Sequence, residues 1–146
     1  MVTPRVIIEE ASTLTDELAA SFVALLPQLS STPPDLELLK AVIDAEESAL
    51  LVACIEGRIV GMCTLVTFPI PSGIRCWIED VVVDTEVRGH GIGAELVNAA
   101  IARAKAAGAR SVDLTSRPSR LDANRLYERL GFQQRETNVY RYLVGD

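Results

Sequence analysis

The chain is poor in several residue types that mark particular classes of protein. Aromatic residues make up 5% of its 146 residues, and there is a single histidine. The cysteines, Cys54, Cys63 and Cys76, are odd in number and show no C-x-x-C spacing. This argues against a disulfide framework and against a metal site, so we expect the cysteines to be small core residues in a reducing compartment.

Long apolar runs are also missing. No stretch approaches the roughly 18 apolar residues of a membrane span, and the residues from Met1 to Arg5 lack a signal-peptide core. We therefore expect a cytoplasmic protein that does not act at a membrane.

Positive charge is scarce overall and unevenly distributed. The net charge of −6 argues against nucleic acid as the main partner, because that binding depends on many Lys and Arg side chains. Residues 1–50 hold nine acidic residues against only Arg5 and Lys40. If the protein has an anionic ligand, we therefore expect it to bind to the second part of the chain. The acidic first part is either a solvated surface or suited to a cationic substrate.

The remaining composition is that of an ordinary globular protein. Hydrophobic residues are 49% and charged residues 23%, and no internal repeat or linker is visible. A chain of this length is expected to form one domain, residues 1–146.

Hydrophobic periodicity predicts a mixed α/β fold in which antiparallel strands precede a parallel strand-helix-strand step. A helix capped by Thr13 and a helix starting at Pro34 are expected near the N-terminus, with Glu56-Gly57 as a tight hairpin and Pro69–Gly73 as a loop. The expected strands are Arg5–Ala11, Ala49–Ile55, Arg58–Phe68, Arg75–Val83 and Ser111–Ser116, with one or two more between Phe132 and Val144. Later helices are expected from Ile92 to Gly108 and from Leu121 to Leu130.

A glycine-rich turn follows the strand that ends at Val83. The segment Arg88-Gly89-His90-Gly91-Ile92-Gly93 opens the next amphipathic helix, so successive backbone N–H groups would lie at the positive end of its dipole. Arg88 adds a permanently charged forked donor. This predicts a phosphate site; the alternative without a ligand is a simple glycine-rich connector.

Two ligands compete for this turn. Gly89, Gly91 and Ala94 satisfy the loose dinucleotide pattern G-x-G-x-x-G/A, with Asp113 about 20 residues further on. In that fold, however, the strand runs directly into the first glycine, and too little chain follows Asp113 for a second nucleotide-binding half. The other pattern is Arg-x-x-Gly-x-Gly, met by Arg88, Gly91 and Gly93.

A second motif favours the latter. The helix Ala123–Phe132 carries Asn124 and Tyr127 and ends in Gly-Phe. Together and in this order, the two motifs resemble the GNAT superfamily of N-acetyltransferases over about residues 75–145. The resemblance implies a GNAT-type sheet, splayed to admit acetyl-CoA, and direct acetyl transfer to an amine in a ternary complex.

The resemblance also implies roles for individual residues. The Arg88–Gly93 loop would hold the pyrophosphate of acetyl-CoA, including Gly89, His90 and Ile92. Backbone groups of Val81 and Val83 would pair with the pantetheine arm, Asn124 would touch that arm, and Tyr127 would donate a proton to the leaving thiolate. His90 is expected to be an exposed loop residue and not a base.

An attacking amine must first lose a proton, and two carboxylates are candidates to accept it. An amine with a Lys-like pKa of about 10.4 is almost wholly protonated at pH 7. Glu79 and Asp80 lie on the cofactor strand, and the period of two places them on opposite faces. We expect Glu79 to be the base, directly or through water; the alternative is that the pair orients substrate or caps a backbone amide.

The sequence leaves the identity of the acetyl acceptor open. The strand Ile78–Val83 resembles that of glucosamine-6-phosphate N-acetyltransferases, which would need a basic patch such as Arg75, Arg117 and Arg120. Asp80 and Arg75 are the candidate substrate residues, and the broader expectation is a primary amine on a small molecule or peptide. A module that binds acetyl-CoA without catalysis is the alternative of another class. GNAT proteins often form homodimers, and the sequence leaves the oligomeric state open.

Overall fold

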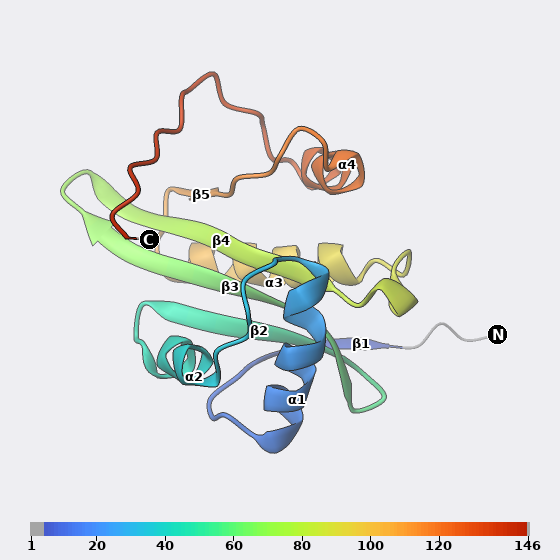
Figure 1. The fold of residues 1–146 in the computed structure, drawn as a ribbon. Coiled ribbons are helices and arrows are strands. Elements are labelled where there is room, and N and C mark those ends of the chain that lie inside the picture. Colours follow the sequence, from blue (N-terminus) through green and yellow to red (C-terminus); the bar gives the residue numbers. More distant parts are fainter. Residues whose placement is uncertain (1–4, 146) are drawn as a thin grey trace. The chain divides into compact units, whose positions relative to one another are not determined.

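The computed structural model describes residues 5–145, which divide into two compact units, one ending at Thr115 and the other beginning at Ser116. Residues 1–4, in which the sequence shows no signal-peptide core, and residue 146 lie outside the described range. The first unit contains a five-stranded sheet in the order β1-β2-β3-β4-β5 (Figure 1). Its elements are β1 (Val6–Glu10), α1 (Asp16–Leu25), the 3₁₀ turn η1 (Leu26–Gln28), α2 (Leu36–Asp44), β2 (Ser48–Ile55), β3 (Arg58–Ile70), β4 (Gly73–Val83), the 3₁₀ turn η2 (Thr85–Val87), α3 (Ile92–Ala106) and β5 (Ser111–Asp113). The second unit contains α4 (Leu121–Arg129).

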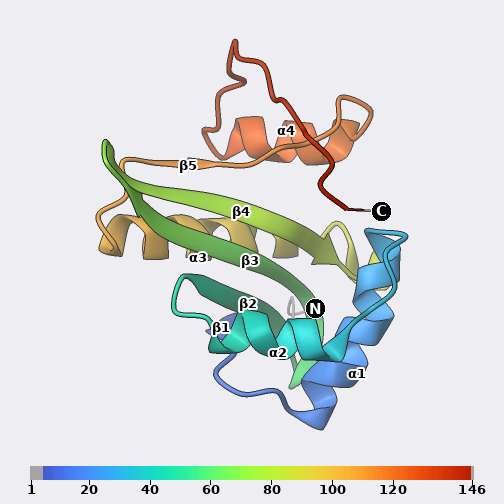
Figure 2. The same ribbon diagram turned by 60° about the vertical axis from the view of Figure 1, so that its left-hand side comes forward.

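The strand pairing confirms the expected fold class. The pairs β1–β2, β2–β3 and β3–β4 are antiparallel, whereas β4–β5, joined through α3, is parallel. A parallel pair requires a crossover, and α3 provides it. Figure 2 shows the first four strands lying side by side in sequence order.

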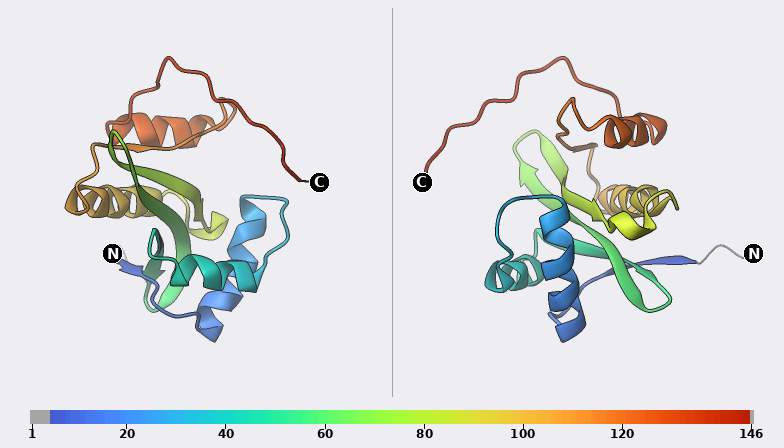
Figure 3. Two further views of the ribbon diagram at one scale, coloured as in Figure 1. Left: turned by 90° about the vertical axis from the view of Figure 1, so that its left-hand side faces the viewer. Right: turned by 45° about the vertical axis from the view of Figure 1, so that its right-hand side comes forward.

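Helices cover both faces of the sheet in the first unit. Figure 3 shows α3 on one side of the β3–β4 hairpin and α1 and α2 on the other. The α1/α2 face carries one core cluster: Leu18, Leu25, Leu39, Leu50, Val52, Met62 and Val82. Burial of each large side chain contributes about 1.5–3 kcal/mol. Gly61 faces α3, because a Cβ built there would lie 3.2 Å from Leu96 Cδ1.

The first two helices begin slightly later than the sequence predicted. Thr15, not Thr13, caps α1, and its hydroxyl accepts from the Leu18 amide at 3.1 Å. Asp35 caps α2 by accepting from two amides, so Pro34 precedes the helix instead of starting it. A threonine or aspartate directly before the first turn satisfies amides that a proline cannot reach.

Both β-hairpins are tight. Glu56 and Gly57 have φ values of 51° and 78°, the left-handed conformation that a two-residue turn of this type requires. At the next hairpin, β3 extends to Ile70 and β4 starts at Gly73. The expected Pro69–Gly73 loop is therefore a two-residue turn, because Pro69 and Ile70 remain paired with the opposite strand.

An irregularity interrupts β4. Met62 pairs with Val82 and Thr64 with Glu79, so three steps along β4 oppose two along β3. Asp80 has φ 51°, a positive value that is uncommon outside glycine. This is a β-bulge, which inserts one residue and reverses the alternation of faces beyond it. The bulge begins beyond Glu79, so the expectation that Glu79 and Asp80 point to opposite faces stays a prediction.

The largest differences between the predicted and the observed strands lie after α3. β5 ends at Asp113 instead of Ser116, and residues 132–145 contain no strand. Alternation gives a segment strand propensity, but a strand forms only with a partner edge. In this tail Val139, Tyr140, Tyr142, Leu143 and Val144 are all largely exposed.

Cysteines behave as small core residues. Cys63 and Cys76 are buried and Cys54 is half-buried, all with free thiols. Burial raises the pKa of the Cys63 thiol to about 12. None of the helices in the described range combines the length and apolarity that a bilayer crossing requires.

Candidate functional site

The glycine-rich turn lies where the sequence placed it. Gly89 and Gly91 have φ values of 87° and 75°, and no atom outside the adjacent residues comes within 4 Å of a Cβ built at either position. Gly91 is the N-cap residue of α3, and no side chain caps this helix end. Helix amides without a capping partner form an anion site together with the helix dipole.

Around these glycines the turn is open to solvent. Arg88, Gly89, His90 and Gly91 are exposed, whereas Ile92 is buried. Arg88 donates from Nε to the carbonyl of Val83 at 3.4 Å. The guanidinium is thereby held next to the turn, and Ile92 fixes the start of the helix in the core. His90 is an exposed loop residue, as predicted.

The turn before the glycines is anchored by side chains from distant elements. Gln28 Oε1 accepts from the Thr85 amide at 2.9 Å. Arg58 Nη2 lies 3.3 Å from Asp84 Oδ2 and 3.6 Å from Glu86 Oε2. Asp84 Oδ1 also accepts from the Glu86 amide at 3.1 Å. Together these contacts fix η2, the segment that leads into the glycine-rich turn.

One edge of β4 is only partly paired. β5 pairs with β4 at Arg75, Cys76 and Trp77, and ends at Asp113, whereas β4 continues to Val83. From Ile78 onward this edge has no strand partner among residues 5–145. Unpaired backbone groups on a strand edge can bind another extended chain. Val81 and Val83, the predicted partners of a cofactor arm, belong to this open part.

Glu79 lies at the beginning of the open edge. It pairs with Thr64, which pairs with Leu50 of the α1/α2 core cluster, so Glu79 is on the α1/α2 face of β4. Both Glu79 and Asp80 are exposed. Partial burial raises the pKa of the Glu79 carboxyl, and the adjacent Asp80 carboxylate raises it further. A raised pKa makes a carboxylate a stronger proton acceptor.

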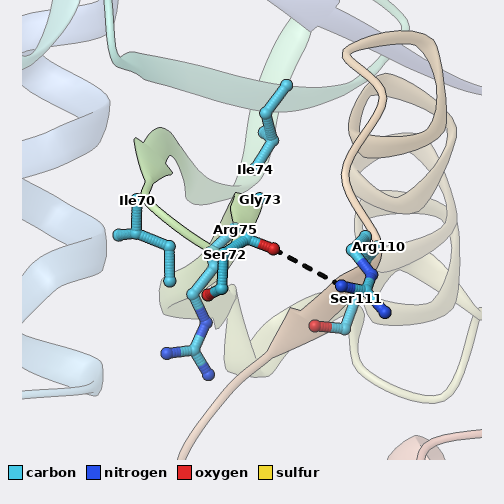
Figure 4. A pocket seen from close by; sticks show the side chains of 7 residues that line it. All are labelled: Ile70, Ser72, Gly73, Ile74, Arg75, Arg110 and Ser111. Carbon is cyan, nitrogen blue, oxygen red and sulfur yellow. Dashed lines mark hydrogen bonds between the residues drawn. The ribbon is translucent and has the colours of Figure 1, made fainter.

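Arg75 precedes Glu79 by four residues on the same strand. Its Nη2 lies 3.4 Å from Asp113 Oδ2 on β5. Arg75, Ser111 and Arg110 line an open pocket at the β3–β4 hairpin, together with Ile70, Ser72, Gly73 and Ile74 (Figure 4). The sequence singled out Arg75 but missed Arg110.

Asn124 and Tyr127 belong to the second unit. The Asn124 amide nitrogen donates to the carbonyl oxygens of Arg117 at 3.0 Å and Pro118 at 3.4 Å, which fixes the segment before α4. Tyr127 is 7% exposed, and its ring meets that of Phe132 edge-on, with centroids 5.8 Å apart. Gly131 lies between the C-cap Leu130 of α4 and Phe132, and has φ 102°.

Gln28 and Arg58 hold the turn before the candidate site, and the sequence did not indicate either of them. Each lies far from the glycine-rich turn in the chain, and neither stands in a recognisable motif. A basic residue after a hairpin glycine and a glutamine in a helical segment are ordinary surface residues. Only the pairing register of β2, β3 and β4 brings Arg58 to Asp84.

Comparison with known proteins gives a consistent result. The model of the acetyltransferase (GNAT) family matches residues 13–132. A transcriptional regulator from Bacillus halodurans C-125 is 31% identical, with 95% of this chain and 100% of that chain covered and a TM-score of 0.82.

Two further proteins resemble this chain over very different lengths. An uncharacterised N-acetyltransferase of Methanocaldococcus jannaschii is 42% identical over 59 residues, which is 40% of this chain and only 26% of that protein's length. The aminoglycoside N-acetyltransferase AAC(6′)-Iy in complex with CoA is 17% identical, covers 99% of this chain and 98% of its own, and has a TM-score of 0.82. At that identity the likeness concerns the fold.

Proposed function

The chain belongs to the GNAT family of acetyltransferases, and we propose that it moves an acetyl group from acetyl-CoA to a primary amine of a small molecule or peptide. The donor, the amine acceptor and the residue roles below are part of this proposal. One observation carries it: an uncapped helix N-terminus behind two glycines of positive φ follows, after the short η2 turn, a strand with an open edge.

This arrangement supports acetyl-CoA as the donor. The diphosphate would be bound by the amides from Arg88 to Gly93 and by the positive end of the α3 dipole. The pantetheine arm would lie along the open edge of β4, where Val81 and Val83 offer backbone groups, and Asn124 would contact the arm. A GNAT-fold neighbour was solved with CoA, which agrees with this choice of ligand.

Acetyl transfer itself would proceed in one ternary complex. The acceptor nitrogen attacks the thioester carbonyl carbon, so that a C–N bond forms and the C–S bond breaks. Glu79 takes the proton that the nitrogen loses, directly or through water, and Tyr127 gives its phenolic proton to the departing sulfur. Exchange with solvent restores both groups. The products are the amide and CoA.

Local structure around Glu79 supports its role as the base. Its pKa is raised by partial desolvation and by the neighbouring Asp80 carboxylate, so Glu79 is a better base than an isolated glutamate in water. β5 ends opposite Trp77, so Glu79 lies on the open part of the β4 edge, directly before the bulge at Asp80. Asp80 would act through its charge and by orienting the ammonium form of the acceptor.

The proposal is tested with the full-length protein in two steps. Titration calorimetry measures acetyl-CoA binding, and release of CoA is then followed across a panel of primary amines, with amine-free hydrolysis subtracted. We expect acetyl-CoA to bind and each CoA released to correspond to one acetylated amine identified by mass spectrometry. Absence of acetyl-CoA binding, or binding of a nicotinamide dinucleotide instead, would overturn the proposal.

A second function has one observation in its favour. The 31% identical relative is described as a transcriptional regulator. A protein that senses acetyl-CoA without catalysis would bind the cofactor with the same loop. In the experiment above it would bind acetyl-CoA tightly and release no CoA in response to any amine.

A further inference from the structure

The proposed base, an aromatic residue and an arginine lie in one row on β4. Arg75, Trp77 and Glu79 alternate with Cys76 and Ile78, which are buried. Their partners on β3 are Phe68, Val66 and Thr64, and Thr64 is on the α1/α2 face. The bulge begins only beyond Glu79, so the three side chains share this face.

The end of this row is a positively charged pocket. It has a volume of about 440 Å³, enough for the end of a small ligand. Figure 4 shows the Arg75 side chain on one side of Ser72 and Arg110 on the other, with Ser111 beside Arg110. None of the residues that line the pocket is acidic. Two guanidinium groups and two hydroxyls are suited to bind an anion.

The two arginines are held differently. Arg75 forms an ion pair with Asp113, with 3.4 Å between Nη2 and Oδ2, and this carboxylate partly neutralises its charge. Arg110 makes no ion pair with any residue in the described range; its Nη1 donates to the Ser72 carbonyl at 3.4 Å, and its Cδ lies 3.2 Å from a Cβ built on Gly73. Gly73 therefore leaves room for the Arg110 side chain against the hairpin. With Asp113 counted, the pocket keeps a net charge of about +1 in a protein of net charge −6.

We propose that the acceptor carries a carboxylate or phosphate group besides its amine, and that Arg75 and Arg110 bind this group while the amine lies at Glu79. This rests on the proposed acetyl transfer. Glu79 is four positions after Arg75 on the strand, which is about 13 Å between Cα positions. Trp77 lies between them and would pack against the middle of the acceptor. Arg75 and Arg110 would thus determine specificity without taking part in the chemistry.

The experiment compares matched acceptors. Linear ω-amino acids of increasing length are set against ω-amino alcohols of the same length and against the corresponding aminoalkyl phosphates. We expect the wild-type kcat/KM to favour an anionic acceptor over its alcohol by about tenfold, the ratio that corresponds to about 1.4 kcal/mol. The carboxylate and phosphate series show which anion the pocket prefers. Equal kcat/KM for the anionic and neutral acceptors would overturn the inference.

Variants connect this preference to the pocket. Arg110→Ala should bring the anion-to-alcohol ratio close to one through a higher KM for the anionic acceptor, and Arg110→Lys should keep part of the preference. Arg75→Gln should act in the same direction. Lys105→Ala removes the same charge from an exposed position of α3 that does not line the pocket, and should keep the wild-type ratio. An unchanged ratio in Arg110→Ala would contradict the proposal.

The outcomes separate this inference from the proposed function. Amine-dependent CoA release without a preference for anionic acceptors contradicts the anion pocket and leaves acetyl transfer supported. If no amine is acetylated although acetyl-CoA binds, acetyl transfer is contradicted and the inference, which depends on it, fails too. Inorganic phosphate adds a direct probe: it should compete with the anionic acceptor in the wild type and more weakly in Arg110→Ala.

Discussion

Arg58 and Asp84 lie 26 positions apart in the chain, yet the guanidinium of Arg58 comes within 3.3 Å of the Asp84 carboxylate. Arg58 starts β3, and Asp84 follows β4 and caps the η2 turn. Asp84 is largely buried, with 16% of its side chain exposed, whereas Arg58 is 62% exposed. The pair joins the β2–β3 hairpin to the segment that enters the glycine-rich turn.

Replacement of Arg58 should therefore weaken cofactor binding without affecting chemistry. Ion pairs with an exposed partner contribute about 0.2–1 kcal/mol, so Arg58→Ala should raise the KM for acetyl-CoA by a factor of roughly 1.4 to 5. We expect kcat to stay within about twofold of the wild type, and Arg58→Lys to recover part of the affinity. Lys40→Ala, which breaks the exposed pair with Asp44 on α2, is the control. A change in kcat alone would contradict a positioning role.

Gly91 and Gly57 allow a matched test of the phosphate loop. Their φ values are 75° and 78°, and a Cβ built at either meets no atom within 4 Å. Alanine in this conformation costs about 1–2 kcal/mol at both positions. Thermal unfolding should therefore show a similar loss of stability for Gly91→Ala and Gly57→Ala, while calorimetry should show weaker acetyl-CoA binding only for Gly91→Ala. A bulky residue, as in Gly91→Val, should abolish binding. Equal affinities in the two alanine variants would mean that the loop does not hold the cofactor.

Glu79 should control the acid side of the pH profile. Its pKa is raised above the ordinary value of 4.5, and a base acts as the carboxylate, so kcat/KM should increase as pH rises through this raised pKa. Glu79→Gln should remove that dependence and lower kcat by about a hundredfold or more. Asp80→Asn removes a neighbouring negative charge, so the acid limb should move to lower pH. An unshifted profile in Asp80→Asn together with full activity in Glu79→Gln would exclude this base.

Tyr127→Phe tests the proposed acid. Phenylalanine keeps the ring that meets Phe132 edge-on, so the local packing of the second unit is preserved. We expect kcat to fall by about a hundredfold, with the dissociation constant of acetyl-CoA nearly unchanged. Circular dichroism and thermal unfolding serve as controls for the fold. Wild-type turnover in this variant would remove Tyr127 from the acid role.

Local sequence signals located the glycine-rich turn but could not show what holds it. Gly89 and Gly91 indicate a turn with positive φ and a helix start within a few residues, because only glycine adopts the left-handed conformation without strain. Gln28 and Arg58 carry no such signal. Their role arises from hydrogen bonds across 57 and 26 positions of chain.

Strand length is the clearest case in which sequence pattern was insufficient. The alternation after Phe132 and the run to Ser116 both indicated strand. Among residues 5–145, however, neither residues 114–116 nor residues 132–145 pair with another strand. The backbone N–H and C=O groups of a strand need hydrogen-bond partners on a neighbouring strand. Strand formation therefore depends on an available sheet edge and not on propensity alone.

The sequence by itself determined the order of helices and strands as far as α4, the Glu56-Gly57 hairpin, the helix start at the glycines and the two motifs of the family, because each depends on residues within one or two turns of chain. The tertiary structure alone decided that Asp80 forms a bulge, that β4 keeps an open edge beyond Trp77, and that Arg110 joins Arg75 in one pocket. These features arise from strand register, which is a relation between distant segments, and register is fixed where a face of the sheet is buried against other elements.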